Sequence, residues 1–196
     1  DIKQELIAKG GLFITKKRYG MKIINDNGKK VDKMMVKGLD TVRSSFPAAM
    51  KKVLSKLLED ILMDVPKDKL DEYIINFKKS MKLIDFDKIS MPIGVKGVKS
   101  AYNYNNFLQI NKLKRYEKIG ESQKIKWVYM KNNPYGFQTM AYKGYEDPRQ
   151  VIEFIKQYID TDKMYKQALQ KKIQMFYEAL SWDMPVDKKN TLERFF

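Results

Sequence analysis

The chain has 196 residues, 43% of them hydrophobic, which is enough to bury the core of one domain or slightly more. It carries 39 Lys and Arg against 24 Asp and Glu, a net charge of +15. This excess favours a polyanionic partner, nucleic acid first and an anionic membrane surface second, although AT-rich codons also produce a lysine-rich surface. Because Cys and His are absent, disulfides, thiolate metal sites and histidine-based triads are excluded. No apolar run approaches the roughly 20 residues of a membrane span, and no secretory signal is visible.

A β-hairpin is predicted near the start of the chain. Residues 11–25 contain β-branched and aromatic residues throughout and are expected to form one strand. Asn27-Gly28 follows, and this pair is typical of a hairpin turn because both turn positions need positive φ. Val31–Val36 then returns as the second strand.

Three consecutive cations, Lys16-Lys17-Arg18, fall in the middle of the predicted first strand. Alternation would place Lys17 and Tyr19 on one face, with Lys16 and Arg18 on the other. Such side chains bind phosphate oxygens, Arg through its planar fork and Lys as a point charge. A solvated edge strand that uses charge to prevent aggregation explains the same pattern.

Helices are predicted next, from apolar residues spaced as on one helical face. The first begins at Ser44-Ser45-Phe46-Pro47, and its stripe is Met50, Val53, Leu54, Leu57, Leu58, Ile61 and Leu62. Pro66 begins the second, with the stripe Leu70, Tyr73, Ile74, Phe77 and Met81.

The rest of the chain is predicted to be helical around a small sheet. We expect residues 85–99 to be irregular, 100–118 helical, and 124–130 and 137–142 to be paired strands. Asp147-Pro148 is expected to cap a further helix. The last helix is expected to begin at Asp160-Thr161-Asp162, with the stripe Tyr165, Leu169, Ile173, Phe176, Tyr177 and Leu180.

Two further segments suggest binding. Residues 37–45 join the hairpin to a helix N-terminus, where hydroxyls, backbone N–H groups and Arg43 suit an anion, although an ordinary capped helix looks the same. The chain ends with Leu192, Phe195 and Phe196 after a polar stretch. These apolar residues either pack back on this domain or enter a pocket of another protein.

Catalytic residues are not predicted. Nucleotidyl transfer needs carboxylates that hold two metal ions about 4 Å apart, and no paired Asp occurs in a strand–turn setting. A Gly-rich phosphate-binding loop is also missing. The sequence therefore predicts no catalytic or metal-ligating residue in this chain.

Several motifs, in their order, resemble the C-terminal part of T-even-type phage family B DNA polymerases. TKKRYGMKIINDNG (Thr15–Gly28) is similar to the family's palm strand with its Lys-Lys-Arg/Lys-Tyr motif, and VKGLDTVRSSFPAAM (Val36–Met50) to the segment that leads into the thumb. KIKWVYMKNNPYGF, YIDTDKMYKQALQKKI and LSWDMPVDKKNTLERFF follow the order of the phage thumb and its terminal peptide. The resemblance covers nearly the whole chain.

The resemblance implies an α+β fold, with a palm-edge β-hairpin followed by a mainly helical thumb that carries a small inserted antiparallel sheet. It implies a palm edge at residues 1–43, a thumb at 44–185 and a flexible tail with a clamp-binding peptide at 186–196. The family's catalytic carboxylates and exonuclease residues would lie upstream of Asp1, so we expect a C-terminal fragment or subunit that is inactive alone. Residues 89–104 look shorter and less regular than the family pattern.

The resemblance also implies site residues and partners. The expected DNA-binding residues are Lys16, Lys17, Arg18, Tyr19, Lys37, Arg43, Ser45 and Lys51. Leu192, Phe195 and Phe196 would bind a sliding clamp. The implied partners are primer-template DNA, the remaining palm and exonuclease portion and the clamp, with no membrane. No cofactor is expected in this chain, Mg²⁺ is expected in the complete polymerase, and the location would be the cytoplasm of an infected bacterial cell.

Two other functions fit the sequence. One is a stand-alone basic module that binds DNA or RNA without a polymerase. The other is a protein-binding adaptor whose charge is incidental. Salt dependence of binding separates them, because neutralised phosphates give a steep dependence and an adaptor does not.

Overall fold

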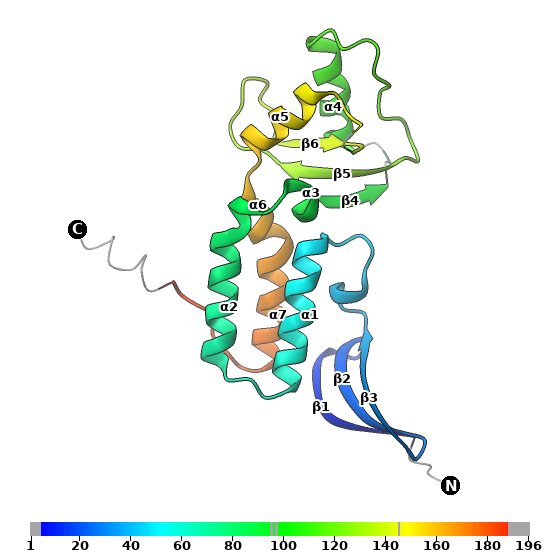
Figure 1. Cartoon of the computed structure of the whole chain (residues 1–196), viewed down its shortest axis with the longest axis vertical. Coiled ribbons are helices and arrows are strands. Elements are labelled where there is room, and N and C mark those ends of the chain that lie inside the picture. The colour runs from blue at the N-terminus through cyan, green and yellow to red at the C-terminus, as the bar shows by residue number, and fades with distance from the viewer. Residues whose placement is uncertain (1–4, 95, 97, 145, 188–196) are drawn as a thin grey trace, which may run out of the picture. The chain divides into compact units, whose positions relative to one another are not determined.

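The computed structural model describes residues 5–94, 96, 98–144 and 146–187 (Figure 1). The described chain divides into two compact units, which are treated separately below. Residues 5–43, 50–80 and 168–187 belong to the first unit, and residues 44–49 and 81–167 to the second. Each unit contains an antiparallel three-stranded sheet together with helices, so the predicted α+β fold class is confirmed.

The sheet of the first unit has the order β1-β2-β3, formed by Leu6–Thr15, Arg18–Asp26 and Lys29–Lys37. The predicted turn at Asn27-Gly28 is confirmed, with φ of 50° and 84°. The prediction of one strand over residues 11–25 is wrong, because Thr15 pairs with Arg18 and the chain reverses between them. The Lys16–Lys17 turn lacks the Gly, Asn or Pro that marks most turns, so no sequence signal identified it.

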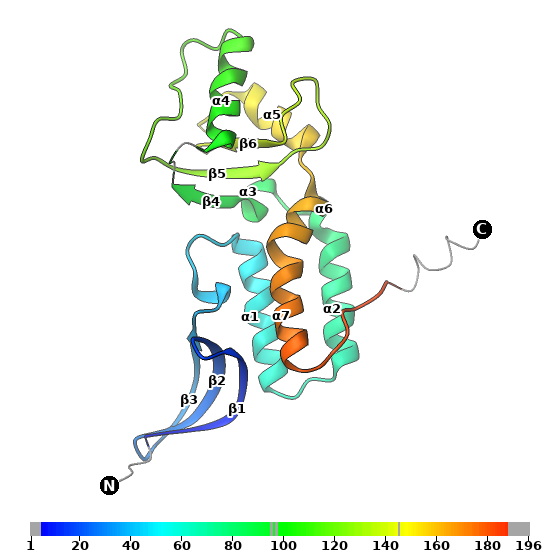
Figure 2. The same ribbon diagram turned by 180° about the vertical axis from the view of Figure 1, so that it is seen from behind.

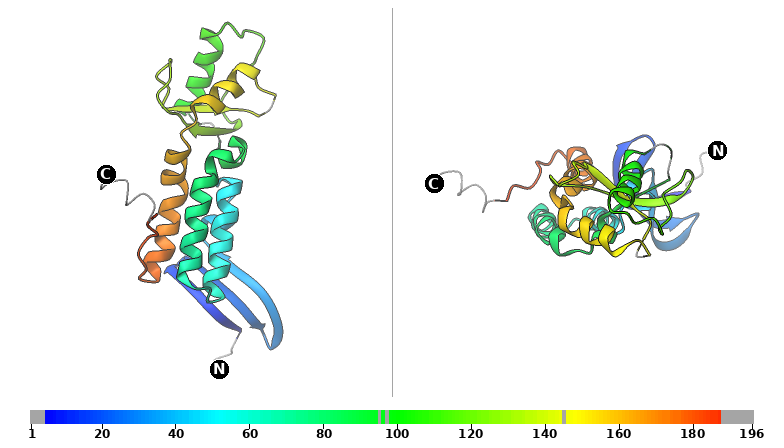
Figure 3. Two further views of the ribbon diagram at one scale, coloured as in Figure 1. Left: turned by 60° about the vertical axis from the view of Figure 1, so that its left-hand side comes forward. Right: turned by 90° about the horizontal axis from the view of Figure 1, so that it is seen from above.

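Three helices of the first unit lie side by side: α1 (Ala48–Leu62), α2 (Lys67–Ser80) and α7 (Lys171–Ala179) (Figures 1 and 2; Figure 3, left). The α1 stripe is buried as predicted except at Ile61, which is half-buried. The hydroxyl of Tyr177 on α7 donates a 2.9 Å hydrogen bond to Asp71 on α2. Buried apolar stripes and this bond hold the three helices together.

Helix α1 packs closely on the sheet because two strand positions lack a side chain. A Cβ atom at Gly20 would lie 2.8 Å from Cδ2 of Leu58, and one at Gly10 would lie 3.8 Å from Cδ2 of Leu62. Glycine in a strand therefore marks a close approach here. Helix α7 contacts the same sheet at β1.

The second unit is built around the sheet β4-β5-β6, formed by Met91–Gly94, Lys124–Tyr129 and Thr139–Tyr142. Helices α4 (Lys99–Ile110) and α5 (Arg149–Tyr158) lie on one side of this sheet (Figures 1 and 2). The short helix α3 (Phe86–Ile89) is fastened to it by Asp87, which accepts hydrogen bonds from Lys126 and Tyr142. The expected strands at 124–130 and 137–142 are confirmed with shorter limits.

Two sequence predictions in the second unit are wrong. Residues 85–99 are not irregular throughout, because they contain α3 and β4. The helix predicted to reach residue 118 ends at Ile110, since Asn111 turns its side chain back to the carbonyl of Phe107 and Lys112 has φ of 55°. Elements of four residues are too short for periodicity to reveal.

Two carboxylates that were predicted as helix caps behave differently. Asp160 caps α6 (Thr161–Met164) by accepting the backbone N–H of Lys163, as predicted. This helix continues through a π-helical segment, Tyr165–Gln170, into α7. Asp147 does not cap α5. Its buried carboxylate accepts the Tyr104 hydroxyl at 2.7 Å and the backbone N–H groups of Lys143 and Gly144.

Candidate nucleic-acid interface

A tight turn exposes two lysines at one end of the first sheet. Lys16 and Lys17 connect β1 to β2, and both side chains are exposed. The turn is pressed against the residue that follows β3, because a Cβ atom at Gly38 would lie only 2.2 Å from the carbonyl oxygen of Lys17. Gly38 has φ of 66°, a conformation that glycine adopts without strain. The expected alternation of Lys16 and Lys17 between two strand faces is therefore wrong.

Aromatic rings lie directly beside this turn. The rings of Phe13 and Tyr19 stack with centroids 5.6 Å apart, and Phe13 is 62% exposed. Tyr19 pairs with Lys37 in the β2–β3 register. The structure thus brings Lys16, Lys17, Tyr19 and Lys37 together at one sheet end. Phe13 was not predicted, because its position opposite Tyr19 depends on the unrecognised turn.

A buried carboxylate lies behind the turn. Asp40, in the 3-10 helix Asp40–Val42, is 8% exposed and forms ion pairs with Arg43 at 3.3 Å and Lys172 at 3.0 Å. Arg18 approaches the same carboxylate at 3.7 Å, and its Nε donates a 3.3 Å hydrogen bond to the carbonyl of Gly38. Arg18 and Arg43, both predicted DNA-binding residues, therefore converge on Asp40. Neither Asp40 nor Lys172 was predicted.

The remaining predicted residues lie elsewhere or outside the described residues. Ser45 is exposed in the second unit, where it lines a shallow cavity of about 230 Å³ with Ile93 and Lys124. Lys51 is half-buried on α1. The apolar residues of the chain end lie outside the described residues: Leu192, Phe195 and Phe196.

A basic loop follows α4 in the second unit. Its exposed cations are Lys112, Lys114, Arg115 and Lys118. The guanidinium of Arg115 lies 4.9 Å from the ring centre of Tyr116, so the pair offers a cation and an aromatic face together. Asn105 fixes the end of this loop, since its side chain exchanges two hydrogen bonds with the backbone of Ile119.

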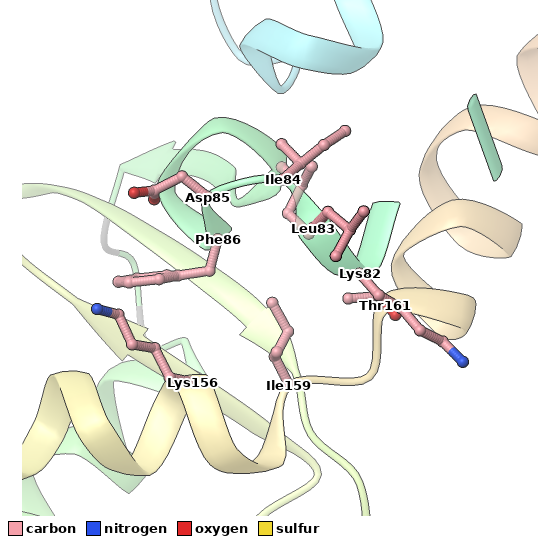
Figure 4. A pocket seen from close by; sticks show the side chains of 9 residues that line it. Lys82, Leu83, Ile84, Asp85, Phe86, Lys156, Ile159 and Thr161 are labelled. Carbon is pink, nitrogen blue, oxygen red and sulfur yellow. The ribbon is translucent and has the colours of Figure 1, made fainter. Parts of the chain in front are cut away.

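A separate cavity of about 410 Å³ lies between α3, the end of α5 and the start of α6 (Figure 4). Its lining residues are Lys82, Leu83, Ile84, Asp85, Phe86, Ile89, Lys156, Ile159 and Thr161. Phe86, Ile89 and Ile159 are buried, whereas Leu83 is 89% exposed. Asp85 uses its side chain to cap α3. The lining mixes apolar side chains with charged ones and brings together no pair of carboxylates.

No carboxylate cluster that could hold a metal ion occurs within residues 5–94, 96, 98–144 and 146–187. No helix in these ranges is long and apolar enough to cross a membrane. At the hairpin end, exposed ammonium groups can pair with phosphate, and an exposed ring can stack on a sugar or base.

The tip of the hairpin is thus a cationic surface with an aromatic pair beside it. A surface of this class suits a phosphate-bearing polymer. The family model described as DNA polymerase family B matches residues 1–180, so the chain belongs to DNA polymerase family B. A comparison with curated protein sequences finds no match. Membership confirms the family B part of the resemblance and places the chain among nucleotidyltransferase sequences.

Proposed function

We propose that this chain forms the palm edge (residues 1–43), thumb (44–185) and tail (186–196) of a T-even-type phage family B polymerase, and that it grips primer-template duplex. The observation that carries the proposal is the hairpin tip, where exposed Lys16 and Lys17 lie beside the Phe13–Tyr19 ring pair. Ammonium groups at such a tip neutralise backbone phosphates with little desolvation cost, because they remain in water.

The tip residues have distinct roles in this proposal. Lys16, Lys17 and Tyr19 contact the duplex near the primer end, where minor-groove acceptors are similarly placed for all correct base pairs. Lys37 extends the basic surface, since it pairs with Tyr19 across the sheet. Arg43, Ser45 and Lys51 are proposed as weaker phosphate contacts, and the loop cations Lys114, Arg115 and Lys118 offer further ones.

Binding of a labelled primer-template duplex at several salt concentrations tests the grip. If about five phosphates are neutralised, log K falls with log salt at a slope of roughly −4 to −5. Lys17→Ala should weaken binding and make the slope shallower by about one. Lys30→Ala, an exposed lysine at the other end of the same sheet, is the matched control. A flat salt response contradicts the proposal and favours an adaptor.

Catalysis is proposed to belong to the remainder of the polymerase, which would hold the carboxylates and the Mg²⁺ ions. The chain then acts in a nucleotidyltransferase inside the cytoplasm of an infected bacterial cell. Copurification from such cells tests this, with recovery of a palm-and-exonuclease polypeptide expected. Polymerase activity of the isolated chain would contradict it.

The tail is proposed to bind a sliding clamp through Leu192, Phe195 and Phe196. Support comes from the sequence, in which apolar residues end a polar stretch. Deletion of residues 192–196 should leave DNA affinity unchanged and remove stimulation of synthesis by the clamp in the assembled enzyme. Equal stimulation of the deleted and intact forms would refute this assignment.

A further inference from the structure

Asp40 joins its own segment to two distant parts of the first unit. Its partners are Arg18 at the start of β2, Arg43 just after the 3-10 helix, and Lys172 on α7. A carboxylate that is 8% exposed needs such partners, because an unpaired buried charge is strongly destabilising. These ion pairs therefore connect the segment next to the exposed turn to α7.

Arg18 links these ion pairs to the turn, because it directly follows Lys17 in the chain. Its Nε is bonded to the carbonyl of Gly38, one Nη faces Asp40, and the other Nη lies 4.0 Å from the sulfur of Met175 on α7. All of these contacts of the Arg18 guanidinium are with groups of the protein. We therefore assign phosphate binding to the neighbouring lysines. Gly38 closes the other side of the turn against the Lys17 carbonyl.

We propose that Asp40 is a positioning residue that fixes the Lys16–Lys17 turn through Arg18 for contact with the sugar-phosphate backbone of duplex DNA. Asp40 itself does not contact DNA. This role rests on the proposed grip on primer-template, and it assigns Arg18 to support of the turn rather than to a phosphate. Lys172 of α7 holds the same carboxylate oxygen of Asp40 that Arg18 approaches.

Simple electrostatics and positioning predict opposite signs for the loss of this carboxylate. A negative charge behind a phosphate-binding surface repels phosphate, so its removal alone should strengthen binding. If Asp40 positions the turn, its removal takes away one of the contacts that hold Arg18. The lysines then lose their fixed geometry, and binding weakens although the chain gains positive charge. Whether DNA affinity rises or falls when this carboxylate is removed therefore distinguishes simple electrostatics from positioning.

The experiment measures the dissociation constant of a labelled primer-template duplex for the chain and its variants, with a salt series for each. For Asp40→Asn we expect about tenfold weaker binding of the duplex. This is the effect of losing one charge-assisted contact between a lysine of the turn and a phosphate. The matched control is Asp32→Asn, which removes a 78% exposed carboxylate paired with Lys22 in the same sheet. It makes the same charge change and should bind equally or more tightly.

Two further variants distinguish positioning from general loss of structure. Lys17→Ala combined with Asp40→Asn should lose less binding free energy than the sum of the two single losses, because both changes act through one turn. Arg18→Lys keeps the charge but loses the planar fork, so it should weaken binding while a melting curve shows that the chain is still folded. This second variant carries the test if Asp40→Asn fails to fold.

Each outcome decides the proposal. Equal or tighter binding by folded Asp40→Asn overturns it, as does unchanged binding by Arg18→Lys. In either case the proposed grip survives if Lys17→Ala still weakens binding. If Lys17→Ala leaves affinity and salt slope unchanged, the grip and the positioning role both fall. Weakening by Asp40→Asn and by Arg18→Lys, without weakening by Asp32→Asn, supports the role.

Discussion

Gly38 and the carbonyl of Lys17 approach so closely that a Cβ atom at Gly38 would lie 2.2 Å from the Lys17 oxygen. Gly38→Ala should therefore move the turn and also strain the backbone, whose φ is 66°. The strain alone costs about 1–2 kcal/mol, and the steric conflict adds to it. We expect a lower free energy of unfolding in urea and weaker binding of primer-template duplex.

Gly28→Ala is the control for this change. Gly28 has φ of 84°, but nothing lies within 4 Å of a Cβ atom placed there. It should carry only the strain of about 1–2 kcal/mol and leave DNA affinity unchanged. Equal losses of DNA affinity in the two variants would show that the close contact at Gly38 has no special role.

Gly20→Ala should destabilise the packing of α1 on the sheet. Its Cβ would lie 2.8 Å from the buried Leu58 side chain, and overpacking of this kind costs about 1–3 kcal/mol. Leu58→Ala removes the obstructing atoms at the cost of a cavity. In urea unfolding, the double variant should therefore lose less stability than the sum of the two single variants. Strict additivity would contradict the contact.

Alkaline pH should unfold the second unit partly through Tyr104. Burial, together with its hydrogen bond to Asp147, raises the pKa of Tyr104 well above its usual value. The unfolded chain then loses this proton first, so the stabilising contribution is complete below about pH 10 and declines as pH rises further. Burial likewise raises the pKa of Tyr165 to about 12, which adds to the decline.

Tyr104→Phe should lower stability at pH 7 by about 1–3 kcal/mol, because Asp147 loses a hydrogen-bond donor. Its stability should then fall less steeply above pH 10 than that of the unchanged chain. Thermal melts between pH 7 and 11 measure both effects. Tyr102→Phe, at a 65% exposed position on the same helix, is the control and should follow the unchanged chain. Identical alkaline slopes for Tyr104→Phe and the unchanged chain would sink this explanation.

Asn105→Ala should release the basic loop that follows α4. The Asn105 amide donates to the carbonyl of Ile119 at 3.0 Å and accepts its N–H at 2.7 Å, which fastens the end of the loop. Without it, trypsin should cut faster at the loop cations, because local opening exposes the backbone. Asn106→Ala on the same helix is the control. Equal cleavage rates for the two variants would contradict the fastening role.

Local signals in the sequence predicted the elements that depend on neighbouring residues. Asn27-Gly28 specified its turn, and the stripe from Met50 to Leu62 specified α1, because both patterns act within a few residues. The Lys16–Lys17 turn was missed because two lysines carry no turn preference. The segment around α3 and β4 was missed because each element has only four residues, too few for periodicity to reveal.

The candidate site was predicted only in part, because some of its contacts join residues that are far apart in the sequence. Lysine and tyrosine side chains near the hairpin tip stand out in the sequence, and so they were identified. Two of the three partners of Asp40 come from β2 and α7, and no pattern of sequence spacing links Asp40 to Lys172. Burial of a carboxylate is also unusual enough that a polar residue in a connecting segment is expected to be exposed.

The first unit is discontinuous in sequence, and this affects the order in which the nascent chain folds. Its strands and first two helices leave the ribosome before residues 81–167, whereas α7, which contacts β1 and α2, leaves after them. The intervening residues form a nearly continuous unit and can fold as they emerge. The earlier segments must wait for α7, so we expect the inserted unit to fold first and the cationic hairpin to acquire its fixed geometry last.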